Sequence, residues 1–278
     1  GIFDEGKLNI ILSDALLSED EVAEVWTPQL SGIHLTDSSL TSDRIFIQDD
    51  IVRQMHPYAT YLSYLVNDII LHTDTVPYSF VTAVDRWYDQ VLTDHDIILS
   101  DYASSCLHAS VGDTVRMSYF LSKDLKNLET SEQLFRVKDI VPLADFQQDS
   151  LLITEFPGLS NVERCTDWDS DLPIKMDHIH KADEDYWYRY HQTPKAIVAL
   201  DAVRADWVSS FGSATALRLS PSPASSASQV QSAHEGGALA VTFSMSDASI
   251  VVKSPKAEGL YSAGHGTDFA SLFLALGF

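Results

Sequence analysis

Two runs, TVRMSYFL (114–121) and LFRVKDIV (134–141), decide the fold that the sequence predicts. In both runs apolar and polar residues alternate, which is the pattern of a strand with one buried face. A polar connector, SKDLKNLETSEQ (122–133), joins them. The sequence therefore predicts a β pair here, at the centre of a β-rich region.

Strands and helices alternate on both sides of this pair. SDYASSCLHA predicts a helix that ends before the Val-Gly-Asp turn at 111–113. DAVRADWVSSF (201–211) predicts a second helix, and strands are predicted at VPYSFVTAV (76–84), IILS (97–100) and AIVAL (196–200). This order predicts the α+β, or mixed α/β, fold class.

Towards the two ends the pattern continues less regularly. Ser18 and Glu21 have capping-box spacing at the start of SEDEVAEVW, which predicts a helix. PYATYLSYLV (57–66) is apolar without a clean period, and the Ser/Ala/Pro-rich stretch from 220 to 237 predicts a flexible loop. Further strands are predicted at LNIIL (8–12), RIFIQ (44–48), ATALRLS (214–220) and ASIVVKS (248–254).

The charge balance narrows the class of partner. Eighteen Lys plus Arg against forty Asp plus Glu give a formal net charge of -22 and a pI near 4.5. A surface of this sign repels phosphate backbones and anionic lipid headgroups, so we expect no nucleic-acid binding. The acidic residues are scattered along the chain, which is typical of a solvated, folded surface.

Catalytic signatures are missing from the sequence. It has no G-x-x-x-x-G-K-[ST] phosphate loop, no G-x-S-x-G and no H-E-x-x-H motif. Its two cysteines, Cys106 and Cys165, are either two separate buried thiols or one disulfide, which requires an oxidising compartment. A disulfide closing a loop of that length would stabilise the fold by about 4 kcal/mol.

The stretch CTDWDSD (165–171) is the richest in possible metal ligands. Its aspartates have the spacing that begins a calcium loop, but the loop then lacks its glycine and its closing glutamate. In an extended segment two histidines at i and i+2 could reach one zinc. Three interpretations stay open: a metal-dependent hydrolase, turns capped by carboxylates around a buried Trp168, or a solvated surface that contacts a partner. The candidate ligands are Asp167, Asp169, Asp171, His178 and His180.

The stretch DEDYWYRY (183–190) raises a second choice. Its aromatic residues could form a stacking platform for a sugar or lipid, as in a secreted ligand-binding module. If the stretch is helical, Trp187 and Tyr190 share one face at i, i+3 spacing and dock on the core. A pocket lined by Tyr186 to Tyr190 would favour the first interpretation, and a buried Trp187 the second.

Several long runs, taken together, resemble the extracytoplasmic domain of bacterial ABC transporter permeases of the FtsX-like, MacB-type kind. The resemblance covers most of residues 55–278. It is carried by PYSFVTAV (77–84), IILSDYASSCLHASVGDTVRMSYF (97–120), FRVKDIVPLADF (135–146), FPGLSNVERCTDWDSDLPIKMDHIHKADEDYWYRYHQTPKAIVALDAVRADWVSSFGSATALRL (156–219) and GTDFASLFLALGF (266–278).

The resemblance implies a fold and a setting. Residues 1–278 would be a single extracytoplasmic module, on the periplasmic side of the inner membrane, between two membrane helices absent from the chain. The apolar run FASLFLALGF at the end fits that expectation. The module would be a MacB-like periplasmic core domain. Its porter-like α/β lobe would comprise residues 1–95 and 201–278, and its β-rich lobe residues 96–200, with an insertion at 142–193. The stretch 220–232 matches nothing in the family.

The resemblance also implies a non-catalytic function. The domain would have no catalytic, cofactor-binding or metal-binding residues, and a separate subunit or domain would hydrolyse ATP. Its partners would be that cognate ATPase, the membrane helices of the same permease and a second permease copy. Outside the membrane it would move a lipoprotein, lipid, peptide or envelope protein.

Overall fold

A computed structural model describes residues 18–124, 127–168, 173–220 and 252–253 of the chain. The chain divides into two compact units, one of residues 1–31 and 243–278 and the other of residues 32–242. The first unit contains α1 (Glu19–Val25) and the 3-10 helix η1 (Pro28–Ser31). The predicted capping box is confirmed, since Ser18 and Glu21 cap each other's backbone at the start of α1.

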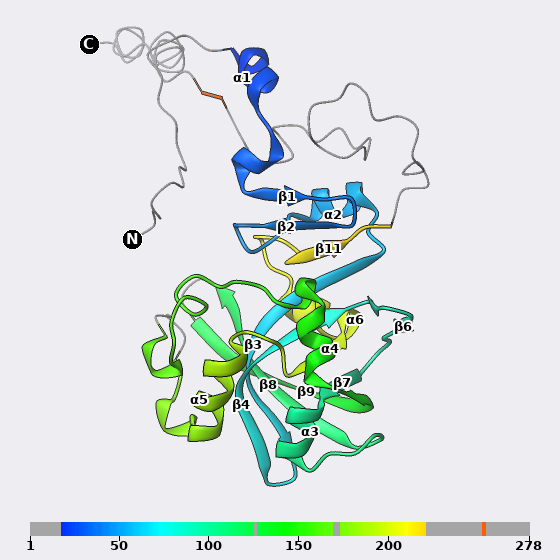
Figure 1. Cartoon of the computed structure of the whole chain (residues 1–278), viewed down its shortest axis with the longest axis vertical. Coiled ribbons are helices and arrows are strands. Elements are labelled where there is room, and N and C mark those ends of the chain that lie inside the picture. The colour runs from blue at the N-terminus through cyan, green and yellow to red at the C-terminus, as the bar shows by residue number, and fades with distance from the viewer. Residues whose placement is uncertain (1–17, 125–126, 169–172, 221–251, 254–278) are drawn as a thin grey trace, which may run out of the picture. The chain divides into compact units, whose positions relative to one another are not determined.

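The second unit is built on a closed six-stranded β-barrel (Figure 1). The strands follow the order β3-β4-β10-β7-β9-β8, and Asp68–Ile70 of β3 pair with Arg116–Ser118 of β8 to close the ring. Two of the pairings, β4 with β10 and β7 with β9, are parallel, so the barrel is mixed. The strands are β3 (Ala59–Leu71), β4 (Asp74–Val84), β7 (Asp96–Ser100), β8 (Thr114–Asp124), β9 (Asn127–Val141) and β10 (Ala196–Ala199).

The barrel overturns the predicted fold class. The expected α+β module with a porter-like α/β lobe is wrong, because the described residues form a β-dominated fold with one nine-stranded sheet and six short α-helices. The barrel also takes β3 and β4 from the range expected to form the α/β lobe and its other four strands from the range expected to be β-rich. Helix-like runs between strands predict alternation, but they do not show whether the strands form an open sheet or a ring.

The β pair predicted at residues 114–121 and 134–141 is confirmed as the hairpin of β8 and β9. Val115, Met117 and Tyr119 alternate into the core on β8, as Phe135 and Val137 do on β9. The polar connector was predicted too long, because pairing continues to Asp124 and Asn127. Cross-strand pairing therefore extends beyond the stretch in which the apolar pattern is visible.

Alternate residues of all six strands fill the barrel interior, and two helices add to it. Ala103 and Leu107 of α3 (Asp101–Leu107) belong to this core, as does Trp207 at the end of α6 (Leu200–Trp207). The Trp207 ring stacks on Tyr64 with centroids 4.7 Å apart. The interior is therefore a packed core that contains large aromatic side chains.

A small antiparallel sheet adjoins the barrel, and β3 belongs to both (Figure 1). It consists of β1 (Ile33–Leu35), β2 (Ser39–Ser42) and β11 (Ala216–Arg218), with β2 in the middle; α2 (Asp49–Met55) follows β2. The strand predicted at RIFIQ is wrong: the chain turns at Ile45, with φ 70°, and only Ile47 bridges, to Ala214.

The segment 142–193 packs on the outside of the barrel. It contains α4 (Leu143–Gln148), three 3-10 turns, η2 (Ser150–Leu152), η3 (Cys165–Asp167) and η4 (Met176–His178), and α5 (Lys181–Tyr190). A short hairpin of β5 (Arg86–Trp87) and β6 (Gln90–Val91) completes the unit. Trp168 and Trp187 form a satellite core with Phe80 of β4, separate from the barrel interior.

Some predictions concern residues outside the described part of the chain. These are the strands at LNIIL and ASIVVKS (apart from two residues), the stretch 220–232 from residue 221 on, and the apolar run at 269–278. Within the described residues, no helix has both the length and the apolar character needed to cross a membrane.

Candidate functional site

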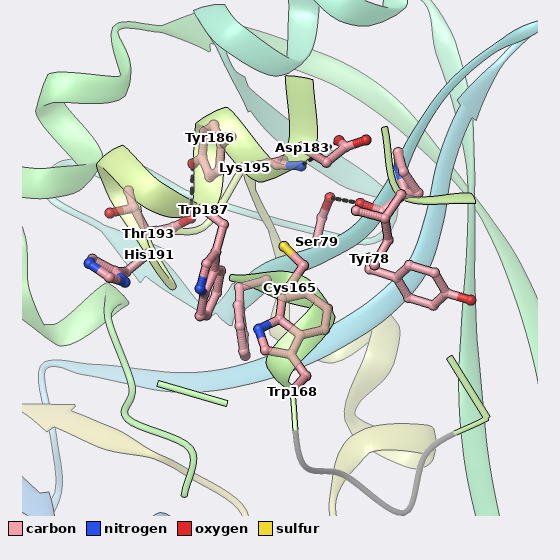
Figure 2. Close-up of a pocket in the computed structure, with 13 residues that line it drawn as sticks. Tyr78, Ser79, Cys165, Trp168, Asp183, Tyr186, Trp187, His191, Thr193 and Lys195 are labelled. Carbon is pink, nitrogen blue, oxygen red and sulfur yellow. Dashed lines mark hydrogen bonds and ion pairs between the residues drawn. The ribbon is translucent and has the colours of Figure 1, made fainter. Parts of the chain in front are cut away.

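A small cavity lies between β4 and the segment 142–193 (Figure 2). Its volume is about 20 Å³, which is enough for one water-sized molecule. Figure 2 shows the sulfur of Cys165 directed towards the pair formed by Lys195 and Asp183. The cavity is lined by Pro77, Tyr78, Ser79, Phe80, Cys165, Trp168, Ile179, Asp183, Tyr186, Trp187, His191, Thr193 and Lys195.

Lys195 is the unusual residue of this site, because it is a lysine that is only 3% exposed. Its Nζ lies 3.5 Å from Asp183 Oδ1 and faces the rings of Tyr186 and Tyr102 at 4.7 and 5.7 Å from their centroids. Burial lowers the pKa of Lys195, and the nearby Asp183 carboxylate opposes that shift only in part. The site therefore favours the neutral amine more than water does.

The two cysteines differ in their surroundings. Both thiols are free, and Cys165 is buried whereas Cys106 is half-buried. Burial, helped by Glu184, raises the pKa of Cys165 to about 12. Cys165 is therefore a protonated thiol at neutral pH and a poor nucleophile or metal ligand. The structure therefore has the two separate thiols that one of our interpretations predicted, but only Cys165 is fully buried as that interpretation expected.

The aromatic stretch forms α5 and docks on the core, as its helical spacing predicts. Trp187 is 3% exposed, and its Nε1 donates to the carbonyl oxygen of Val162 at 3.0 Å. Trp168 packs edge-on against Trp187 with centroids 5.0 Å apart, and the Tyr186 hydroxyl donates to Thr193 O at 2.9 Å. Tyr188 alone points outward, at 69% exposed. A buried Trp187 is the result that argues against a stacking platform.

The predicted metal ligands do not converge. Asp167, His178 and His180 are exposed and lie on separate turns, η3, η4 and the start of α5. The described part of the chain contains no group of three or more ligand side chains that could hold a metal ion. Asp169 and Asp171 lie outside that part. The interpretation of 165–168 as turns that seat Trp168 agrees with its 9% exposure.

A buried carboxylate, Asp149, joins the barrel to the small sheet. Its Oδ1 accepts from Arg218 Nη2 of β11 at 2.7 Å, and its Oδ2 accepts from Tyr61 OH of β3 and Trp87 Nε1 of β5, both at 3.2 Å. The Asp149 side chain is 1% exposed. Burial of Tyr61 next to this carboxylate raises the pKa of the phenol, so the hydroxyl stays a donor.

Sequence reasoning missed both Lys195 and Asp149. Lys195 directly precedes the buried strand AIVAL, so a lysine next to an apolar run was an available signal. Asp149 carries no such signal, because it is one of forty acidic residues and its three side-chain partners lie 62 to 88 positions away.

Comparison of the chain with models of known protein families found no match. Comparison with curated proteins also found none.

Proposed function

We propose that this chain is the non-catalytic extracytoplasmic domain of an FtsX-like ABC transporter permease, which transmits ATP-driven motion to a partner outside the membrane. The supporting observation is the route of the chain through unit 32–242. The chain enters this unit in β1 and leaves the described part of it in β11, and β2 pairs with both.

The geometry of these strands gives the distance between the start of β1 and the end of β11. Ile33 lies opposite Ser42 of β2, and Arg218 lies opposite Ser39. Three residues along a strand and two strand spacings across the sheet separate these points by about 14 Å. In this proposal, membrane helices beyond residues 1 and 278 would act on these two neighbouring points through residues 1–32 and 219–278.

Motion at these connections has a direct route to the barrel. β3 pairs with β11 through Ala59–Tyr61 and with β8 through Asp68–Ile70, so one continuous strand spans the small sheet and the barrel. Asp149 adds a second link, since it binds Arg218, Tyr61 and Trp87 together. A packed barrel held by two such links would move as a rigid body when the connections move.

In this proposal the energy comes from a separate ATPase, and the domain supplies shape and stiffness. Closure of the ATPase would shift the membrane helices, and the barrel would swing and press on, or release, a lipoprotein, lipid, peptide or envelope protein. A second permease copy would complete the assembly. The strongly acidic surface suits a protein or peptide partner better than an anionic lipid.

The parent gene provides the first test. The proposal requires apolar membrane helices on both sides of residues 1–278 and a neighbouring ATPase gene; polar flanks or a stop codon would refute it. In the full-length complex, spin labels on β4 and on the partner copy should change their separation when a non-hydrolysable ATP analogue binds. Labels within one barrel should keep their distance.

A further inference from the structure

The outward faces of the barrel strands are not equally covered. The segment 142–193 packs over β4, β7 and β10, since Val84, Ile98 and Ile197 of these strands share a core with Phe146 of α4. The outward side chains in the middle of the hairpin of β8 and β9 are exposed instead. A side chain exposed on a barrel strand is available to a partner, so its chemistry indicates which partner it suits.

The exposed part of this hairpin has one apolar side chain beside two arginines. Val115 and Phe135 face the barrel interior, so Arg116, Leu134 and Arg136 next to them face outward, and all three are exposed. Leu134, which is 58% exposed, lies directly opposite Arg116 and two residues from Arg136. Such neighbours are about 5 Å apart across a strand pair and about 7 Å apart along a strand. We call these three residues the β8–β9 face.

The arginines of the β8–β9 face are poorly neutralised by the described residues. Arg116 makes one ion pair, with the exposed Glu132, at 3.6 Å. The side chain of Arg136 has no hydrogen bond or ion pair within the described ranges. Asp96 lies beside Arg136 on β7, but it binds Lys138 Nζ at 2.7 Å. The face therefore carries positive charge on a chain whose formal net charge is -22.

We propose that the β8–β9 face docks a short acidic segment of a partner protein, with carboxylates on Arg116 and Arg136 and one apolar side chain on Leu134. Charge complementarity selects this occupant, because the guanidinium of arginine matches a carboxylate with two parallel N–H donors. Alternate side chains of an extended segment lie on one side, about 7 Å apart. That spacing matches Leu134 and Arg136, so an apolar residue and an acidic residue two positions apart suit this face.

A short segment suits this face better than an anionic membrane does. Charges more than about 8 Å away are largely screened at physiological ionic strength, so a small ligand on the face interacts mainly with the two arginines. A membrane is wider than the face and would also meet the acidic surface around it, on a chain with forty Asp plus Glu against eighteen Lys plus Arg. This inference does not depend on the proposed transport function, because the chain alone can be tested for binding.

The test uses a short dye-labelled peptide in which leucine has a glutamate two residues away on each side and serine between. Its binding to the whole chain is measured by fluorescence anisotropy at low salt. Arg136→Glu should weaken binding about tenfold, because it removes one attraction and adds one repulsion. Leu134→Ser should weaken it about fivefold by removing the apolar contact. The matched variant Arg189→Glu makes the same charge change at an exposed arginine of α5 and should leave binding unchanged.

The peptide and its competitors separate this proposal from its alternatives. A peptide with glutamine in place of glutamate should bind about tenfold more weakly. Equal losses in Arg136→Glu and Arg189→Glu would show that net charge alone governs binding, and they would overturn the proposal, as would a lack of saturable binding by the glutamate peptide. Competition by phosphatidylglycerol vesicles that disappears in Arg136→Glu would make the face a lipid site and would also overturn it.

Discussion

Replacing Asp149 by alanine should destabilise the barrel unit by about 3–5 kcal/mol. The carboxylate is buried and accepts four hydrogen bonds, from the side chains of Arg218, Tyr61 and Trp87 and from the backbone N–H of Leu151. Alanine removes every acceptor and leaves the donors in place. The loss therefore exceeds that of an ordinary surface substitution, which is about 0.5 kcal/mol.

The magnitude follows from the exposure of each partner. The Arg218 side chain is 28% exposed, so water solvates part of its stranded charge and the loss at this pair falls at the low end of the range for buried pairs. Trp87 and Tyr61 are buried, at 3% and 0% exposed, and each unmet donor costs about 1–3 kcal/mol. Because these losses share one site, they do not add in full.

Urea unfolding, followed by circular dichroism and tryptophan fluorescence, measures the effect. Asp149→Asn keeps the shape and one acceptor oxygen, so it should lose roughly half as much free energy as alanine. Glu155→Ala, at an exposed acidic residue of the same segment, should change stability by less than about 0.5 kcal/mol. A loss below about 1 kcal/mol for Asp149→Ala would refute the view that this carboxylate links the small sheet to the barrel.

Three further predictions follow from local geometry. Gly212→Ala should lower the free energy of unfolding by more than about 2 kcal/mol, because the added Cβ would lie 2.2 Å from Ile47 O. The matched variant Gly112→Ala should lower it by about 1 kcal/mol, from backbone strain alone, because nothing lies within 4 Å of the added Cβ. Trp168→Ala should speed hydrogen exchange in α5 and leave the barrel strands protected. Cys165, whose pKa is raised to about 12, should react with a disulfide reagent far more slowly in the folded than in the unfolded chain, until pH rises towards that value.

Each of these measurements has a contrary result. Similar losses for the two glycine variants would mean that the contact with Ile47 O is relieved by a shift of the chain. Faster exchange throughout the barrel in Trp168→Ala would show that the satellite core and the barrel unfold together. Rapid reaction of Cys165 at neutral pH would mean that the segment 142–193 opens readily.

Local elements of this fold could be predicted, but their closure into a ring could not. The hairpin of β8 and β9, the capped helix α1 and the strands β4, β7 and β10 all follow from alternation, caps and turns. The barrel depends on the pairing of β3 with β8, about 50 positions apart. The β3 run is apolar on both faces, so its sequence carries no period that indicates which neighbours it has.

The candidate site was predicted only in part, for a related reason. The docking of α5 and the burial of Trp168 follow from residue type and spacing, since large aromatics seek a core. The richest set of ligand residues proved exposed and dispersed, because carboxylates on turns need no metal. Lys195 gains its character from Asp183, twelve positions away, and from the rings of α3 and α5. The spacing of residues along one segment cannot show that side chains from different elements will be in contact in the fold.

The position of β10 in the barrel has a consequence for synthesis of the chain. This four-residue strand lies between β4 and β7, yet it is made after all five other barrel strands and after the whole segment 142–193. Until about residue 199 leaves the ribosome, the edges of β4 and β7 that β10 will join have no partner in the ring. The nascent chain must keep those edges from pairing elsewhere, so the barrel closes late and its folding rate depends on long-range contacts.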